Sequence, residues 1–264
     1  MKKVVCYCLV FISFMFMFGC GNIVFLPGFS PLTPQIQLEK DLMSATVVIY
    51  GVRVKDIQNK YEVEGYDVCT ATAFERRGDD YFFVTAAHCF NPDYANVWCL
   101  SLDEMAPLKK PDEKKLFTVT PLVVGNQYLG QDLAVVASKL IGVNLPTMPL
   151  ASSDPTVGDN VINVAAPKFR DKQLYRGVIK TTNFYRTIFS TRGANWQSAT
   201  LIALSEGSAQ KGSSGSSVVS GSAGGIVAIL VGNSYWEKAA ITLPISQFKK
   251  FWKDFLSDMD NCDS

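Results

Sequence analysis

Short apolar stretches separated by turn residues occupy most of the chain after residue 44. Six stretches rich in β-branched and aromatic residues come first, at residues 45–54, 61–74, 81–85, 96–102, 116–124 and 133–137. Six more follow, at residues 160–165, 174–181, 199–204, 216–219, 225–231 and 239–244. Many short strands at this spacing are typical of β-sandwiches and β-barrels, not of alternating strands and helices. The pattern predicts an all-β fold built from two series of strands.

Two features mark where the series of strands is interrupted and where it ends. Residues 144–157 contain three prolines and separate the two series, so we expect domains at residues 44–148 and 149–264. After the last stretch, apolar residues fall at helical spacing with lysines between them: Ile245, Phe248, Phe251, Trp252 and Phe255. This spacing predicts an amphipathic C-terminal helix whose aromatic face packs against the core.

The first 43 residues have a different character. Two lysines precede an uncharged run at residues 4–19, which is short for a membrane span because a spanning helix needs ~20 apolar residues. A basic start, an apolar middle and a small residue at the end are typical of a secretory signal peptide. Residues 20–43 contain three prolines and little amphipathic pattern, which predicts an extended tether.

The signal ends in Gly19-Cys20, which resembles the cleavage site of bacterial lipoproteins, where the cysteine receives lipid and becomes the new N-terminus. Met17 and Phe18 depart from that pattern, which usually has leucine and then a small residue there. We therefore expect residues 1–19 to be a signal peptide and Cys20 to be a lipidation site. The protein is then exported and lipid-anchored in a bacterial cell envelope, on the periplasmic face or the cell surface. A plain membrane anchor and the ordinary signal peptide of a secreted protein are the alternatives.

Composition and charge exclude several classes of protein. The 264 residues are 48% hydrophobic and only 19% charged, which argues against disorder and allows two domains with real cores. The formal net charge is +1, and removing the two lysines of the signal leaves 23 basic against 24 acidic residues. With no basic block, we expect no nucleic-acid partner. With no heptad repeat or exposed apolar stripe, we expect a monomer.

Cysteines and histidine limit the chemistry. Once the signal is removed and Cys20 carries lipid, four cysteines remain: Cys69, Cys89, Cys99 and Cys262. An even number in an exported chain predicts disulfides, and four cysteines leave three connectivities open. The single histidine is His88. One imidazole with disulfide-bonded cysteines leaves no ordinary zinc ligand set, so we expect no metal and no other cofactor.

Three short segments together carry a candidate reaction. They are TAAHC at residues 85–89, DLAV at residues 132–135 and GSSG at residues 212–215. Singly, each has a structural interpretation: a histidine after a strand, an aspartate before a strand and a flexible loop. Together they offer a hydroxyl nucleophile, an imidazole base and a carboxylate that holds the base in one tautomer. The glycines beside the nucleophile let backbone N–H groups turn toward a developing oxyanion.

These segments resemble the motifs of the chymotrypsin-like serine peptidases, and the chain looks closest to the bacterial trypsin-like group with the HtrA/Deg proteases and glutamyl endopeptidases. The likeness covers roughly residues 44–258 and includes the order histidine, aspartate, serine. It implies two six-stranded antiparallel β-barrels of the trypsin fold with a C-terminal α-helix. It also implies a serine endopeptidase acting on proteins or peptides. No segment follows Ser264, so we expect no PDZ domain.

The resemblance assigns a role to each matching residue. Ser214 would be the nucleophile, His88 the general base and then acid, and Asp132 the group that orients His88. The N–H groups of Gly212 and Ser214 would form the oxyanion hole. The alternative function is a catalytically silent protease fold that serves as a binding lipoprotein, since a fold does not prove an activity.

The resemblance also implies a Cys69–Cys89 disulfide beside His88, and with it Cys99–Cys262 as the remaining pair. Ser213 stands where the family usually has aspartate or asparagine. Because Ser213 cannot form the ion pair of digestive relatives, we expect no trypsin-style zymogen switch.

Specificity is the least determined property. By alignment with the family, Ser208 would lie near the base of the S1 pocket, with Leu230 and Ala240 on its walls, and residues 225–230 resemble the strand that pairs with substrate. No acid falls in the pocket, which argues against arginine or lysine at P1. We expect a small or medium apolar P1 residue, with broad preference because a methylene changes binding by only ~1–3 kcal/mol.

Overall fold

The structure is a computed structural model that describes residues 34–57, 60–93, 95–102, 116–167, 171–190, 193–204, 209–234 and 236–262. The expected signal peptide at residues 1–19, the expected lipidation site Cys20 and residues 21–33 of the expected tether lie outside this range. Within the described residues, no helix is long and apolar enough to cross a membrane. Residues 35–264 form one compact unit.

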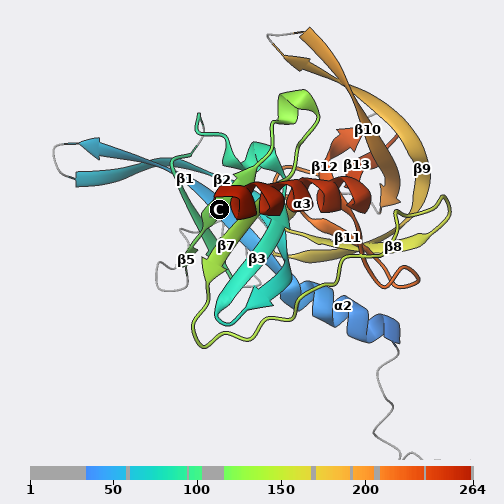
Figure 1. The fold of residues 1–264 in the computed structure, drawn as a ribbon, viewed down its shortest axis with the longest axis horizontal. Helices are drawn as coiled ribbons and strands as arrows, with labels where there is room; N and C mark the ends of the chain where they lie inside the picture. The colour runs from blue at the N-terminus through green and yellow to red at the C-terminus, as the bar shows by residue number, and fades with distance from the viewer. Residues whose placement is uncertain are drawn as a thin grey trace, which may run out of the picture. The chain divides into compact units, whose positions relative to one another are not determined.

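Seven antiparallel strands make the first sheet (Figure 1). They are β1 (Thr46–Ile57), β2 (Lys60–Arg77), β3 (Asp80–Thr85), β4 (Val97–Ser101), β5 (Leu116–Thr118), β6 (Thr120–Val124) and β7 (Ala134–Lys139), in the order β5-β4-β1-β2-β3-β7-β6. Only Val119 separates β5 from β6, so the predicted strand at residues 116–124 is one stretch of chain with a bend. Its first half pairs with β4 and its second half with β7. This stretch therefore joins the two ends of the sheet, which makes six strands in effect.

The second sheet is a closed barrel of six strands. They are β8 (Asn160–Ala165), β9 (Gln173–Ser190), β10 (Gly193–Leu204), β11 (Ser217–Ser220), β12 (Gly225–Ser234) and β13 (Ala239–Pro244), in the order β10-β13-β12-β11-β8-β9. The chain passes from one sheet to the other between Met148, whose N–H donates to Ala73 O, and Leu150, which bridges Ile226. The predicted all-β fold with two series of six strands is confirmed.

Two hairpins are longer than the sequence pattern predicts. The β1–β2 and β9–β10 hairpins extend well past the stretches of alternating residues, and Figure 1 shows both reaching away from the sheets that carry them. A projecting two-stranded ribbon has no core face to cover, so its sequence lacks the strict alternation from which strands are recognised.

The N-terminal segment departs from the prediction. Residues 34–43, expected to be part of an extended tether, belong to helix α2 (Pro34–Ala45). Proline is well tolerated in the first turn of a helix, where its missing N–H has no partner to lose. Leu42 and Ala45 are fully buried on one face of α2 and join the core that lies between the sheets. Burial of this face, which the weak amphipathic pattern did not reveal, stabilises the helix.

Polar contacts attach α2 to the second barrel. The Arg176 guanidinium on β9 donates to both carboxylate oxygens of Glu39, at 2.8 Å from Nη2. Lys172 Nζ donates to the backbone oxygens of Met43 at 2.9 Å and Thr46 at 2.7 Å. A cation at the C-terminal end of a helix interacts favourably with the unpaired carbonyl groups there. The helix is therefore docked at both its middle and its end.

The C-terminal helix α3 (Ile245–Cys262) forms as predicted and connects the two sheets. Its Phe248 and Trp252 are buried and meet Phe74 of β2 edge to face, with ring centroids 5.3 and 5.9 Å apart. Trp252 also lies 6.3 Å from Phe82 of β3. The aromatic face of α3 thus packs on the first sheet, although the helix follows the last strand of the second.

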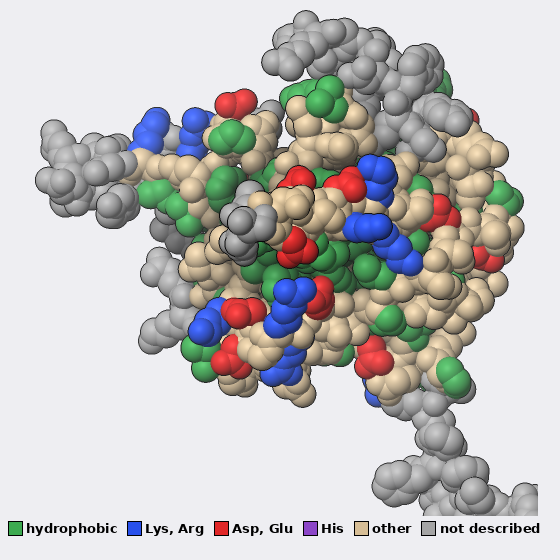
Figure 2. Space-filling view, in the orientation of Figure 1, with side chains coloured by type: hydrophobic (Ala, Val, Ile, Leu, Met, Phe, Trp, Pro, Cys, Tyr) green, Lys and Arg blue, Asp and Glu red, His purple; other side chains and the backbone are tan. Residues whose placement is uncertain are grey.

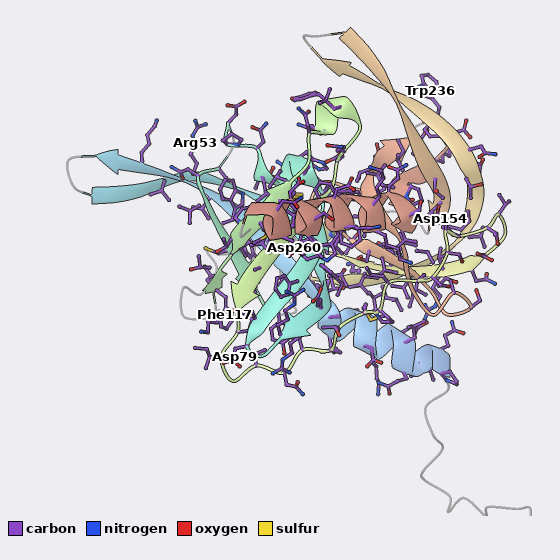
Figure 3. All side chains as sticks on the ribbon, viewed as in Figure 1. Arg53, Asp79, Phe117, Asp154, Trp236 and Asp260 are labelled. Carbon is purple, nitrogen blue, oxygen red and sulfur yellow. A yellow bond between two sulfur atoms is a disulfide. The ribbon has the colours of Figure 1, made fainter. Side chains whose placement is uncertain are left out.

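Contacts at the first turn of α3 set its direction. The Asp154 carboxylate accepts hydrogen bonds from the N–H of Ser246 at 2.8 Å and from its hydroxyl at 2.6 Å, which pairs a backbone donor that a helix start leaves free. Figure 3 places Asp154 near the start of α3 and Asp260 near its end. Figure 2 shows charged side chains along the outer side of α3, with apolar side chains beside them.

Candidate active site

Strand register brings His88 and Asp132 together. Strands β3 and β7 are antiparallel neighbours in which Thr85 pairs with Ala134. His88 comes three residues after this pair and Asp132 two residues before it, so both lie beyond the same end of the two strands. The chain after β3 turns into a short 3-10 helix, η1 (Ala87–Phe90), which carries His88.

Three hydrogen bonds join the two residues. His88 Nδ1 lies 3.0 Å from Oδ1 and 3.0 Å from Oδ2 of Asp132, and the backbone N–H of His88 donates to Oδ1 at 3.0 Å. Asp132 is only 3% exposed, whereas the His88 side chain is 30% exposed. When the Asp132 carboxylate accepts a hydrogen bond from Nδ1–H, Nε2 is the ring nitrogen left as a hydrogen-bond acceptor. The pair has the geometry of an oriented general base.

Ser214 lies in a tight series of turns before β11. The N–H of Ser213 donates to Gln210 O at 2.9 Å, and Gly212, the third residue of that turn, has φ +95°. A positive φ at the third position is the type II pattern, in which the central peptide is turned over relative to type I. Glycine is the residue that adopts this conformation without strain. The backbone conformation therefore favours glycine at the first position of the GSSG motif, and Gly215 with φ +85° extends this to the last.

Two backbone donors of this loop are left open. In the part of the chain that the structure describes, neither the N–H of Gly212 nor the N–H of Ser214 has a hydrogen-bond acceptor. The neighbouring N–H groups are paired: Gly215 donates to Leu230 O at 2.7 Å and Ser216 donates to Ser213 O at 3.1 Å. Unpaired N–H groups on a nucleophilic serine and on the residue two before it are the arrangement that stabilises an oxyanion.

Contacts with the first barrel bring Ser214 to the His88 side. Ser214 O accepts from Thr70 N–H at 2.8 Å and lies 4.0 Å from Cys89 Sγ. A Cβ on Gly215 would overlap Thr85 Oγ1 and Thr70 O, so the nucleophile loop lies directly against the strands that lead to His88. Among the described residues, no hydrogen bond joins Ser214 Oγ to His88. In unliganded enzymes such contacts are often long and shorten when substrate binds.

One predicted disulfide is present and the other is not. Cys69 and Cys89 are bonded, with Cα atoms 6.1 Å apart, and this bond flanks His88. Cys99 is a free thiol, so the expected Cys99–Cys262 pair is wrong; the side chain of Cys262 lies outside the described part of the structure. Cys99 sits on β4, between β1 and β5, whereas α3 packs on β2 and β3. Burial raises the pKa of the Cys99 thiol above its ordinary value.

Among the described residues, one group has potential metal-ligand atoms close together. These are the atoms of Cys69, His88 and Cys89, which lie within 4.8 Å of one another. The two sulfur atoms are bonded to each other, and a metal requires thiolates. This group therefore does not suit a metal ion in its oxidised form.

Two of the three predicted pocket residues are buried in the barrel core. Leu230 is 1% exposed and Ala240 is 2% exposed, and both pack inside the second barrel with Ile202 and Ile179. A pocket wall must be reachable by substrate, so their assignment to the S1 pocket is not supported. Ser208, the expected base of the pocket, lies outside the described residues.

Sequence reasoning also missed the open edge of β12. Residues 225–229 pair with β11, and β13 covers the other edge of β12, so the expected substrate-pairing segment has little free edge. Beyond a bulge at Val231, residues 232–234 pair only with β13 among the described strands. An unpaired strand edge can take up an extended peptide. Gly232 was the available signal, because glycine within a strand often marks the close approach of another backbone.

Comparisons with known proteins agree with the observed fold. The family described as trypsin-like peptidase domain matches residues 69–229, which include His88, Asp132 and Ser214. No curated protein matches the chain. The chain is similar in structure to Rv3671c from M. tuberculosis H37Rv, solved as a serine-to-alanine mutant in its inactive form. The TM-score is 0.59 with 12% identity, over 88% of this chain and 98% of that one, so the likeness concerns the fold. Because the family match spans more than half of this chain, the chain belongs to the trypsin-like peptidase family.

Proposed function

We propose that the protein is a serine endopeptidase that hydrolyses peptide bonds through Ser214, His88 and Asp132. The observation that carries this proposal is the juxtaposition of an oriented imidazole and a serine turn with two open backbone donors. His88 Nδ1 is held 3.0 Å from the buried Asp132 carboxylate, and the N–H groups of Gly212 and Ser214 have no acceptor among the described residues.

In the proposed reaction, His88 Nε2 removes the proton of Ser214 Oγ as that oxygen attacks the scissile carbonyl. The N–H groups of Gly212 and Ser214 donate to the resulting oxyanion, each contributing ~10²–10³ in rate. His88 then gives the proton to the leaving amine, which breaks the C–N bond and leaves an acyl-enzyme on Ser214. Water, deprotonated by His88, then attacks the acyl carbon, and the acid leaves as Ser214 Oγ takes the proton back from His88.

The proposed substrate is an extended protein or peptide segment. Residues 232–234 of β12 pair with β13 on one side and offer a second strand edge that is unpaired among the described strands. A peptide that pairs there would bring its scissile bond along the edge toward Ser214.

A silent binding protein remains the second candidate. Its supporting observation is that no hydrogen bond joins Ser214 Oγ to His88 in the described structure. A fluorophosphonate probe separates the two candidates, because it reacts only with an activated serine. We expect one adduct by intact mass on the wild type and on Ser222→Ala, a surface serine of the same barrel. We expect none on Ser214→Ala or His88→Ala. A folded, disulfide-bonded wild type that takes no label would exclude the peptidase.

We further propose that the enzyme is exported and anchored by lipid on Cys20, as the Gly19-Cys20 sequence suggests. In bacteria expressing the full chain, the wild type should partition into the detergent phase of a Triton X-114 extract. Cys20→Ser should not be processed to the same mature mass. Equal mature masses for the two proteins would rule out lipidation at Cys20.

A further inference from the structure

We propose that Thr70 is a positioning residue that holds the oxyanion turn in place from the opposite barrel. The inference rests on the proposed function, since it assigns a role within that reaction. Thr70 lies on β2 of the first sheet, whereas the turn belongs to the second barrel, 142 residues further along the chain. Among the described residues, no hydrogen bond joins Thr70 to His88, so its effect would pass through the turn.

Every polar atom of Thr70 is engaged. Its N–H donates to Ser214 O at 2.8 Å, and its hydroxyl donates to Gly212 O at 2.8 Å. The same hydroxyl accepts from Ala166 N–H at 3.2 Å, and Thr70 O accepts from the Thr85 hydroxyl at 2.8 Å. Thr70 is fully buried. One side chain therefore satisfies a backbone acceptor and a backbone donor that no water could easily reach.

The two carbonyl groups that Thr70 binds belong to the residues that supply the oxyanion donors. The peptide between Gly212 and Ser213 is held at its oxygen by Thr70 and at its N–H by Gln210 O. With that peptide fixed, the positive φ of Gly212 sets the direction of the Gly212 N–H. The Ser214 carbonyl is fixed by Thr70 in the same way. Because an oxyanion hole works only with donors that are already aimed, this clamp supplies preorganisation.

A matched control lies two residues along the same strand. Thr72 is also fully buried, but its hydroxyl has no partner among the described residues. Thr70→Val and Thr72→Val make the same chemical change on the same face of β2, and only the first removes a bond to the oxyanion turn. Thr70→Ser keeps the hydroxyl and should therefore keep the bond to the turn and a labelling rate close to that of the wild type.

The experiment measures the second-order rate of fluorophosphonate labelling on the full chain, with folded fraction followed by circular dichroism. We expect Thr70→Val to label ~10–100-fold more slowly than the wild type, because a small misplacement of reacting groups slows a reaction by about this much. Thr72→Val should stay near the wild-type rate and Thr70→Ser within a few-fold of it. The pH at which the rate reaches half its plateau, which reports His88, should not move in Thr70→Val, because the His88–Asp132 pair is untouched.

Each outcome decides a separate question. A wild type that does not label overturns the proposed function itself. Equal rates for Thr70→Val and Thr72→Val, with the wild type active, overturn only the role of Thr70. A shift of the pH midpoint in Thr70→Val also overturns it, since the effect would then pass through His88. If Thr70→Val does not fold, Thr70→Ala also removes the bond to Gly212 O, and equal labelling of Thr70→Ala and Thr72→Ala refutes the clamp.

Discussion

The two barrels contribute to the candidate site by different physical means. The first barrel positions side chains: His88 and Asp132 extend from neighbouring strands and are joined by hydrogen bonds of 3.0 Å. The second barrel positions backbone: Ser214 follows a glycine with φ +95°, and two N–H groups are left open. A side chain can be replaced without disturbing the strand that carries it. The direction of a backbone N–H group, in contrast, depends on the backbone angles of the turn itself. Substitutions in the first barrel should therefore change chemistry alone, and those in the second should change chemistry and stability together.

The largest expected effect tests the side-chain half of this comparison. Asp132→Asn should lower the labelling rate by ~10⁴ while leaving the fold intact, because an amide can donate to His88 Nδ1 and select the wrong tautomer. Stopped-flow or discontinuous labelling against circular dichroism measures both properties. Asp93→Asn, an exposed carboxylate of the same barrel, is the control and should be neutral. A rate within tenfold of the wild type would remove Asp132 from the reaction.

The second prediction tests the backbone half. In Gly215→Ala the new methyl would overlap Thr85 Oγ1 and Thr70 O at a residue with φ +85°. Overpacking costs ~1–3 kcal/mol and the left-handed backbone ~1–2 kcal/mol, so the free energy of unfolding should fall by about 3 kcal/mol or more. Gly221→Ala is the control, since its methyl meets only Leu38 Cδ2 at 3.5 Å. Urea midpoints measure the difference, and equal midpoints would show that the loop does not lie against the first barrel.

The smallest effect concerns covalent links within the first barrel. Burial raises the pKa of Cys99, and a thiol with a raised pKa is deprotonated to a smaller extent at a given pH. In the native protein, alkylation of Cys99 by iodoacetamide should therefore begin at higher pH than in the denatured chain. Peptide mapping of denatured, unreduced protein should find Cys99 alkylated and the Cys69–Cys89 pair protected. A protected Cys99 would restore its pairing with Cys262.

Much of the architecture follows from local sequence. Strand alternation, the amphipathic spacing of α3 and the glycines around Ser214 are properties of adjacent residues, so the all-β fold and the three motifs could be predicted. Helix α2 could not, because its stability comes from burying Leu42 and Ala45 and from Arg176 bound to Glu39. Its own amphipathic pattern is weak.

Residue pairings show the same division more sharply. The sequence identifies His88, Asp132 and Ser214 as a set because each stands in a recognisable motif. Only the folded chain determines that Cys99 is free, that Leu230 is a core residue, and that Thr70 contacts Gly212 across 142 residues. Motifs are local because a turn or a strand end constrains its own neighbours. Partners brought together from two barrels depend on how both barrels pack, and no short stretch of sequence contains that information.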